Sequence, residues 1–163
     1  MTKIVKMETT MNKQSARVLF SNKTKQIVVE VICYLFVLLW LYAATNKILD
    51  FQKFQVQIGQ SPILTDYAVI IAWIIPSIEI ILSIALLLKR TLIAGLYASF
   101  GLMLMFTTYI IIILNFAERV PCSCGGILEK MGWTEHLIFN IGFVILALIA
   151  IIFQTQLNEN KAR

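Results

Sequence analysis

The feature that most constrains this chain is the length of its stretches without a charged residue. Residues 91–117 and 137–158 hold none, and residues 26–46 and 67–88 hold one acid each. A helix needs about 20 mostly apolar residues to cross the hydrocarbon core of a bilayer. Because 59% of the chain is hydrophobic and 14% is charged, a soluble domain is not expected. We predict an all-α integral membrane four-helix bundle, with spans at about residues 26–46, 67–88, 91–116 and 134–154.

The basic residues predict how the bundle is oriented. Residues 1–25 are expected to be a basic cytoplasmic tail without fixed structure and residues 155–163 a second cytoplasmic tail, flanking a membrane domain at 26–153. These tails and the Lys89-Arg90 turn carry ten of the fourteen Lys and Arg residues. Such residues are in excess on the cytoplasmic side of membrane proteins. We therefore predict a multi-pass protein of the bacterial inner (cytoplasmic) membrane with both termini in the cytoplasm.

The net charge of +5 is explained by this orientation. The basic residues follow the membrane topology, so we expect the lipid bilayer as a partner and no nucleic acid. The loop at 118–135 then faces the periplasm, a compartment that permits disulfides. The sequence does not fix the oligomeric state.

Polar residues gather in the outer halves of the predicted spans, which predicts a polar cavity open to the outer face. An acid inside a span is costly and usually faces a partner or a cavity, so Glu79 is a candidate for a proton relay. It is alternatively a structural anchor, protonated or paired with Asn46, Lys47 or Asn140. For Lys47 alone, the simpler interpretation is a side chain that reaches for the membrane surface at a helix end. The remaining polar residues of the outer halves include Ser77, Thr107, Thr108, Asn115 and His136.

Two cysteines, Cys122 and Cys124, lie on the outward loop with one residue between them. We rank a redox-active pair first, a static disulfide second and a soft-metal (copper) site third. A bridge across one residue closes almost no loop and so stabilises little. His136 is the nearest residue with a near-neutral reference pKa, which suits activation of a thiol, although it is also explained as an interfacial residue. Cys33 belongs to the other side of the membrane and is expected to be a buried thiol.

Several runs together resemble the MauE branch of the DoxX-like membrane proteins. They are LYAATNKILDFQKFQVQIGQSPIL (41–64), WIIPSIEIILSIALLL (73–88) and PCSCGGILEKMGWTEHLIFNIGFVILALIAI (121–151). The resemblance implies a four-helix protein of the bacterial inner membrane. Its namesake is required for producing methylamine dehydrogenase, a periplasmic enzyme rich in disulfides, and is linked to a thioredoxin-like partner. Carried over by position, the implied functional residues are Cys122 and Cys124, with Asn46, Lys47 and Glu79 as polar positions of the family pattern.

One departure from related machines limits what the resemblance implies. Four-helix disulfide generators of the DsbB and vitamin K epoxide reductase type use two cysteine pairs and a quinone, whereas this chain has one outward pair. Either a partner supplies the second pair or the quinone step is absent, so a quinone stays open as a cofactor and no other is expected.

Our hypothesis is thiol-disulfide exchange between Cys122 and Cys124 and a periplasmic thioredoxin-like or cysteine-rich partner. His136 assists as a catalytic residue, while Glu79, Asn46, Lys47 and Asn140 form a cavity or proton relay. No metal ligands are assigned. The rival hypotheses are a non-enzymatic membrane subunit that helps to assemble an envelope partner, and a copper site.

Overall fold

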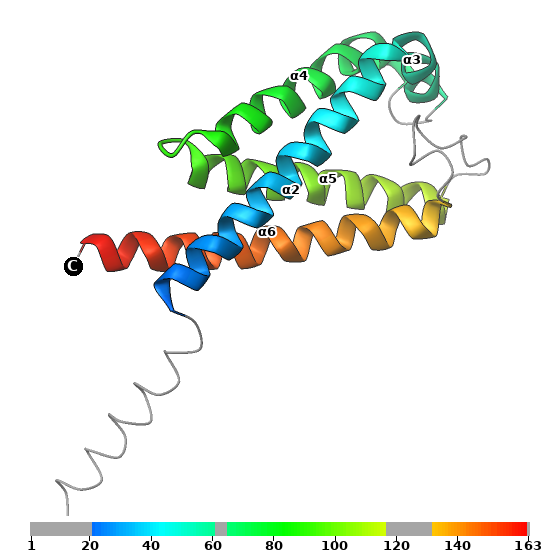
Figure 1. Cartoon of the computed structure of the whole chain (residues 1–163). Helices are drawn as coiled ribbons and strands as arrows, with labels where there is room; N and C mark the ends of the chain where they lie inside the picture. The colour runs from blue at the N-terminus through cyan, green and yellow to red at the C-terminus, as the bar shows by residue number, and fades with distance from the viewer. Residues whose placement is uncertain (1–20, 61–64, 117–131, 163) are drawn as a thin grey trace, which may run out of the picture.

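The computed structural model describes residues 21–60, 65–116 and 132–162, and this part of the chain consists of helices joined by short turns (Figure 1). Four of its helices are long and apolar enough to cross a membrane. The all-α, four-span prediction is therefore confirmed. Cys122 and Cys124 lie outside the described residues. The elements are α2 (Asn22–Leu49), α3 (Phe51–Gly59), the short 3₁₀ helix η1 (Thr65–Tyr67), α4 (Ala68–Leu87), α5 (Leu92–Phe116) and α6 (Trp133–Ala162).

The first and last long helices extend beyond the predicted spans. The first begins at Asn22 and the last continues to Ala162, through most of the expected C-terminal tail. The two helix ends are joined by side chains, because Lys25 Nζ donates to Gln156 Oε1 at 2.7 Å and Asn160 Nδ2 donates to Asn22 Oδ1 at 3.3 Å. Neither extension contains a glycine or a proline that would end the helix.

The four long helices pack as a ring in which α2 contacts α4 and α6, and α5 contacts α4 and α6. Aromatic side chains fill the centre: Phe36 of α2 meets Phe143 of α6 edge to face, with ring centroids 5.2 Å apart. Trp40 of α2 reaches across the ring and donates from Nε1 to Ser99 Oγ of α5 at 3.1 Å. This hydrogen bond satisfies the indole N–H of a side chain that is almost completely buried.

The surfaces that face away from the ring are apolar. Leu38 of α2, Ile81 of α4, Ile138 of α6 and Tyr97 of α5 are all more than half exposed. Side chains of this kind are stable against lipid and costly against water. The protein is therefore a multi-pass membrane protein with lipid-facing helices.

A tight connection makes α4 and α5 a hairpin. Thr91 Oγ1 donates to the carbonyl of Ala85 at 2.9 Å, across the turn. A Cβ added at Gly95 would lie 3.2 Å from the Ala85 carbonyl carbon, which is closer than a side chain normally approaches a backbone. The absence of a side chain at Gly95 therefore lets the two helices come together.

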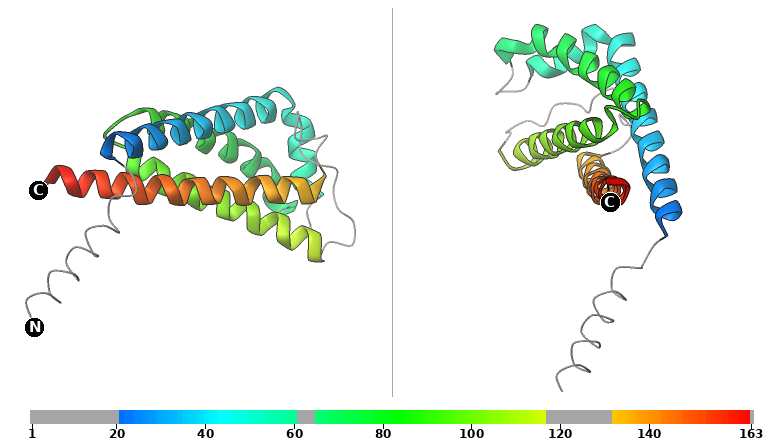
Figure 2. Two further views of the ribbon diagram at one scale, coloured as in Figure 1. Left: turned by 60° about the horizontal axis from the view of Figure 1, so that its bottom comes forward. Right: turned by 90° about the vertical axis from the view of Figure 1, so that its left-hand side faces the viewer.

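The short helix α3 was not predicted, because it lies between the predicted spans at 26–46 and 67–88. It covers the end of the bundle that lies opposite the C-terminus (Figures 1 and 2). Its residues Phe54 and Ile58 pack against Ala68 and Ala72 of α4. This contact holds α3 against α4 at that end of the bundle.

Candidate functional site

A cavity of about 370 Å³ lies among the helices and is lined in part by residues of α3. This is the size range of small-molecule sites in proteins. The five polar residues that sequence reasoning assigned to a cavity or to catalysis within the described chain all line it: Asn46, Lys47, Glu79, His136 and Asn140. Their roles in proton transfer or catalysis stay predictions.

The wall of this cavity is less polar than the sequence indicated. Four of the outer polar residues do not line it and donate to the carbonyl four residues earlier in their own helix, at 2.7–2.8 Å: Ser77, Thr107, Thr108 and Asn115. Aromatic rings line the cavity instead: Trp40, Tyr42, Phe54, Phe106, Tyr109, Trp133 and Phe139. The site is an aromatic chamber with a few polar groups.

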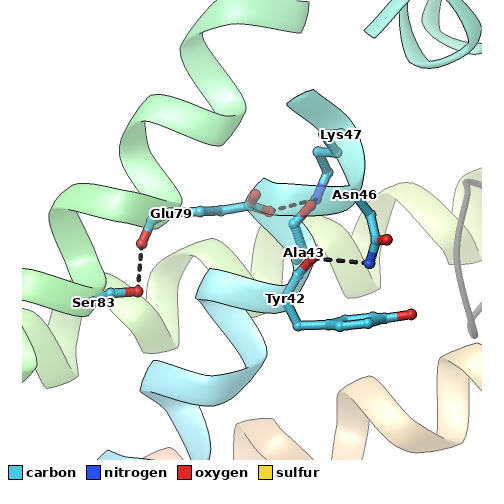
Figure 3. A network of polar contacts seen from close by, with 6 residues as sticks. All are labelled: Tyr42, Ala43, Asn46, Lys47, Glu79 and Ser83. Carbon is cyan, nitrogen blue, oxygen red and sulfur yellow. Dashed lines mark hydrogen bonds and ion pairs between the residues drawn. The ribbon is translucent and has the colours of Figure 1, made fainter. Parts of the chain in front are cut away.

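A salt bridge between α2 and α4 is the central polar contact of the site (Figure 3). Lys47 Nζ lies 2.6 Å from Glu79 Oε1, and the Glu79 side chain is completely buried. The Lys47 side chain is 17% exposed. The pairing of Glu79 with Lys47 was one of the arrangements predicted, whereas the interpretation of Lys47 as a side chain reaching for the membrane surface is wrong.

Lys47 is held in place by further contacts. Its Nζ lies 3.5 Å from the carbonyl oxygen of Ala43, to which it donates. It also lies 5.7 Å from the ring centroid of Phe54 and 5.9 Å from that of Phe106. Cations within about 6 Å of a ring face are attracted by its negative face. The ammonium is therefore surrounded by a carboxylate and two rings, which replace part of its lost hydration.

The neighbours of the salt bridge bond within their own helices. Asn46 Nδ2 donates to the carbonyl of Tyr42 at 2.9 Å, and Ser83 Oγ donates to the backbone carbonyl of Glu79 at 2.9 Å (Figure 3). Pro76, one turn before Glu79, is buried within α4. Asn46 therefore lines the cavity but is not bonded to Lys47 or Glu79.

Two buried polar atoms of the site have no hydrogen-bond partner among the described residues. They are Oε2 of Glu79 and Nδ2 of Asn140. Asn140 is 4% exposed. A buried polar atom without a hydrogen bond costs about 1–3 kcal/mol. The two atoms belong to α4 and α6, and both residues are among those that line the cavity.

His136 stands in the first turn of α6 and is half-buried. The start of this helix is fixed by Glu135, whose Oε2 accepts from the backbone N–H of Gly132 at 3.0 Å. This is one half of a capping box. Because Cys122 and Cys124 lie outside the described residues, the predicted closeness of His136 to them stays a prediction.

The described residues hold no group of three or more His, Cys, Asp or Glu side chains that could bind a metal ion. Cys33 is a buried free thiol in α2, as predicted. The copper hypothesis depends on Cys122 and Cys124, so it also stays untested.

Sequence reasoning missed the contribution of α3 to the site. Phe54, Gln57 and Ile58 of this helix line the cavity. Their spacing of three and four residues is that of one helix face, and this signal was present in the segment between the first two predicted spans. The aromatic character of the wall was also missed, although the rings come from three of the four spans and from α3.

Comparison with known proteins finds one family. The family model described as "Methylamine utilisation protein MauE" matches residues 25–153, which include α3, α4 and α5 completely and most of α2 and α6. Comparisons with curated proteins and with solved structures find no match.

Proposed function

The chain belongs to the MauE family, and from this membership and the cavity we propose an inner-membrane protein that exchanges disulfides with a periplasmic partner. The partner is a thioredoxin-like or cysteine-rich protein, and the reacting pair is Cys122 and Cys124. The family description refers to methylamine utilisation, and we propose that the exchange reaction serves this process.

One observation carries this proposal. The segment that holds both cysteines joins α5 to α6, and both helices contribute to the cavity wall, through Tyr109 and Ile110 on one side and Trp133 and His136 on the other. Thiol chemistry next to such a wall would be shielded from water. The only histidine of the chain lies on that wall.

The proposed reaction is a balanced exchange. A thiolate of the partner attacks the Cys122–Cys124 disulfide, and a mixed disulfide forms while the other sulfur leaves as a thiolate. The second thiol of the partner then attacks the mixed disulfide, so the partner becomes oxidised and the Cys122–Cys124 pair reduced. The His136 imidazole accepts a thiol proton and so favours the thiolate, which is the attacking form. The reverse sequence follows the same steps.

A redox titration tests whether the pair is exchangeable. The purified protein is equilibrated with glutathione mixtures, its thiols are alkylated, and the mass shift is read on a gel. We expect a reduction potential above about −300 mV, the value below which structural disulfides resist reduction by glutathione. A lower potential would show a static disulfide. Copper or zinc bound stoichiometrically by the wild type and lost in Cys122→Ser would show the metal site.

A trapping experiment tests for the partner. Cys124→Ser leaves Cys122 unable to complete the exchange, so a mixed disulfide with the partner should accumulate in cells. The matched control is the variant with serine at both positions, which keeps only Cys33 and should trap nothing. If the doubly substituted protein still supports full accumulation of its envelope partner, the chain is a non-enzymatic assembly subunit.

A further inference from the structure

Two residues that line the cavity, Glu79 and Asn140, each have a buried polar atom that the described fold leaves without a hydrogen bond. Lys47 pairs with Oε1 of the Glu79 carboxylate, and Oε2 is the carboxylate oxygen that remains as a hydrogen-bond acceptor. Asn140 Nδ2 is a donor. Both side chains line the cavity and both are more than nine-tenths buried. A molecule that satisfies them must offer a donor and an acceptor.

A hydroxyl group offers both functions. Its proton can be donated to Glu79 Oε2, while its oxygen can accept from Asn140 Nδ2. Two hydroxyl groups on one scaffold satisfy the pair equally well. A hydrocarbon chain satisfies neither atom, and a carboxylate would add a second negative charge beside Glu79.

The rest of the wall selects the body of the molecule. Trp40, Tyr42 and Phe106 are among the seven aromatic residues that line the cavity. Aromatic rings pack best against other rings in offset or edge-to-face arrangements. The cavity volume of about 370 Å³ accommodates a ring system of two or three fused or linked rings.

We propose that this cavity binds a membrane-soluble aromatic molecule that carries a hydroxyl group, with the hydroxyl held between Glu79 and Asn140. Phenols and hydroquinones belong to this class. Lys47 holds the Glu79 carboxylate in position through its other oxygen. The proposal does not depend on Cys122 and Cys124, so it stands or falls separately from the proposed exchange reaction.

The test compares two probes that differ only in the hydroxyl group. Tritiated 1-naphthol and naphthalene are titrated against the full chain in lipid nanodiscs, with empty nanodiscs to measure partition into lipid. After this correction, we expect the wild type to bind 1-naphthol at least about tenfold more tightly than naphthalene. A buried hydrogen bond changes a dissociation constant by about tenfold. Equal binding of the two probes, or no binding beyond partition, would overturn the proposal.

Variants then assign the donor. Asn140→Leu should remove most of the preference for 1-naphthol while leaving naphthalene binding in place. Asn115→Leu is the matched control, because Asn115 is an exposed asparagine of α5 that bonds its own helix at Ile111. An unchanged hydroxyl preference in a folded Asn140→Leu protein would contradict the assignment to Asn140. The probe comparison on the wild type needs no variant and decides the proposal if Asn140→Leu does not fold. Serine at both Cys122 and Cys124 should leave binding unchanged.

Discussion

Breaking the Lys47–Glu79 salt bridge from one side should strongly destabilise the bundle. The change is Lys47→Met, which keeps an unbranched side chain of similar length but removes the charge. Glu79 is completely buried and would lose the ammonium that lies 2.6 Å from its Oε1. The carboxylate would then face rings and aliphatic side chains.

The magnitude follows from two opposing terms. At a separation of 2.6 Å and an effective dielectric constant of about 20, two unit charges attract by about 6 kcal/mol. Desolvating each ion costs several kcal/mol, so the intact pair contributes little net stability. Removing one partner keeps the desolvation cost of the other without the attraction, which costs about 3–5 kcal/mol. Lys47→Met should therefore destabilise by about that amount.

The assay is unfolding by SDS in mixed micelles, followed by tryptophan fluorescence. The midpoint for Lys47→Met should shift to a clearly lower SDS fraction. Lys89→Met is the matched control, because it removes the same charge from an exposed turn and should change stability by about 0.5 kcal/mol or less. The double variant Lys47→Met with Glu79→Met should recover most of the loss, since an apolar pair replaces a buried ion pair at little cost.

Two results would contradict the dependence of Glu79 on Lys47. If Lys47→Met is no more harmful than Lys89→Met, Glu79 does not depend on the ammonium. If the double variant is as unstable as the sum of its single changes, the two residues are not coupled.

Three further predictions concern other features of the bundle. Cysteines placed at Gln60 and Arg90 in a cysteine-free background should react differently with an impermeant maleimide added to cells, with Gln60→Cys labelled and Arg90→Cys protected; the reverse pattern would contradict cytoplasmic termini. Gly95→Ala should destabilise by about 1–3 kcal/mol in the SDS assay, because its Cβ would lie 3.2 Å from the Ala85 backbone, whereas Gly101→Ala has open space and should be neutral; equal effects would show that close helix approach is not the cause. Glu79→Gln should be less destabilising than Glu79→Leu, because the glutamine oxygen still accepts a hydrogen bond from the lysine, and equal losses in unfolding midpoint would contradict this.

The four spans were predictable because the bilayer thickness sets the minimum length of an apolar segment that can cross it. A run of uncharged residues long enough to cross the core has few alternatives to a spanning helix, and the runs at 91–117 and 137–158 meet this condition without a break. The prediction that Glu79 would be paired or would face a cavity had the same origin, since an isolated acid is too costly in lipid. Both properties depend on composition and length alone.

The partner of Glu79 required more than composition. Asn46 and Lys47 are adjacent, so they point about 100° apart around the helix, and the rotation of α2 decides which of them meets Glu79. That rotation is fixed by core side chains such as Trp40. Lys47 is seven residues, or about two turns, after Trp40 and so shares its buried face. This spacing was a usable signal, but its meaning depends on knowing which face is the core.

The helix α3 and the aromatic wall could not be predicted from the length and composition of apolar segments. A helix of nine residues is too short to span a membrane, so a search for spans passes over it. Its stability comes from the contact of Phe54 and Ile58 with α4, which is a tertiary property. Likewise, an aromatic residue in a span packs equally well against lipid or a cavity, and only the assembled bundle distinguishes the two.

The salt bridge also has a consequence for how α2 and α4 find their alignment. The remaining contacts between these helices are formed largely by aliphatic and aromatic side chains, which pack acceptably at several longitudinal offsets. Sliding α2 by one turn moves Lys47 by about 5.4 Å along α4 and would leave two separated charges in a dry interior. The ion pair therefore fixes the alignment of α2 along α4. It adds little to the stability of the native bundle, but it raises the energy of every misaligned pairing of the two helices. A residue inserted between Trp40 and Lys47 would leave no alignment that keeps both the core face and the ion pair.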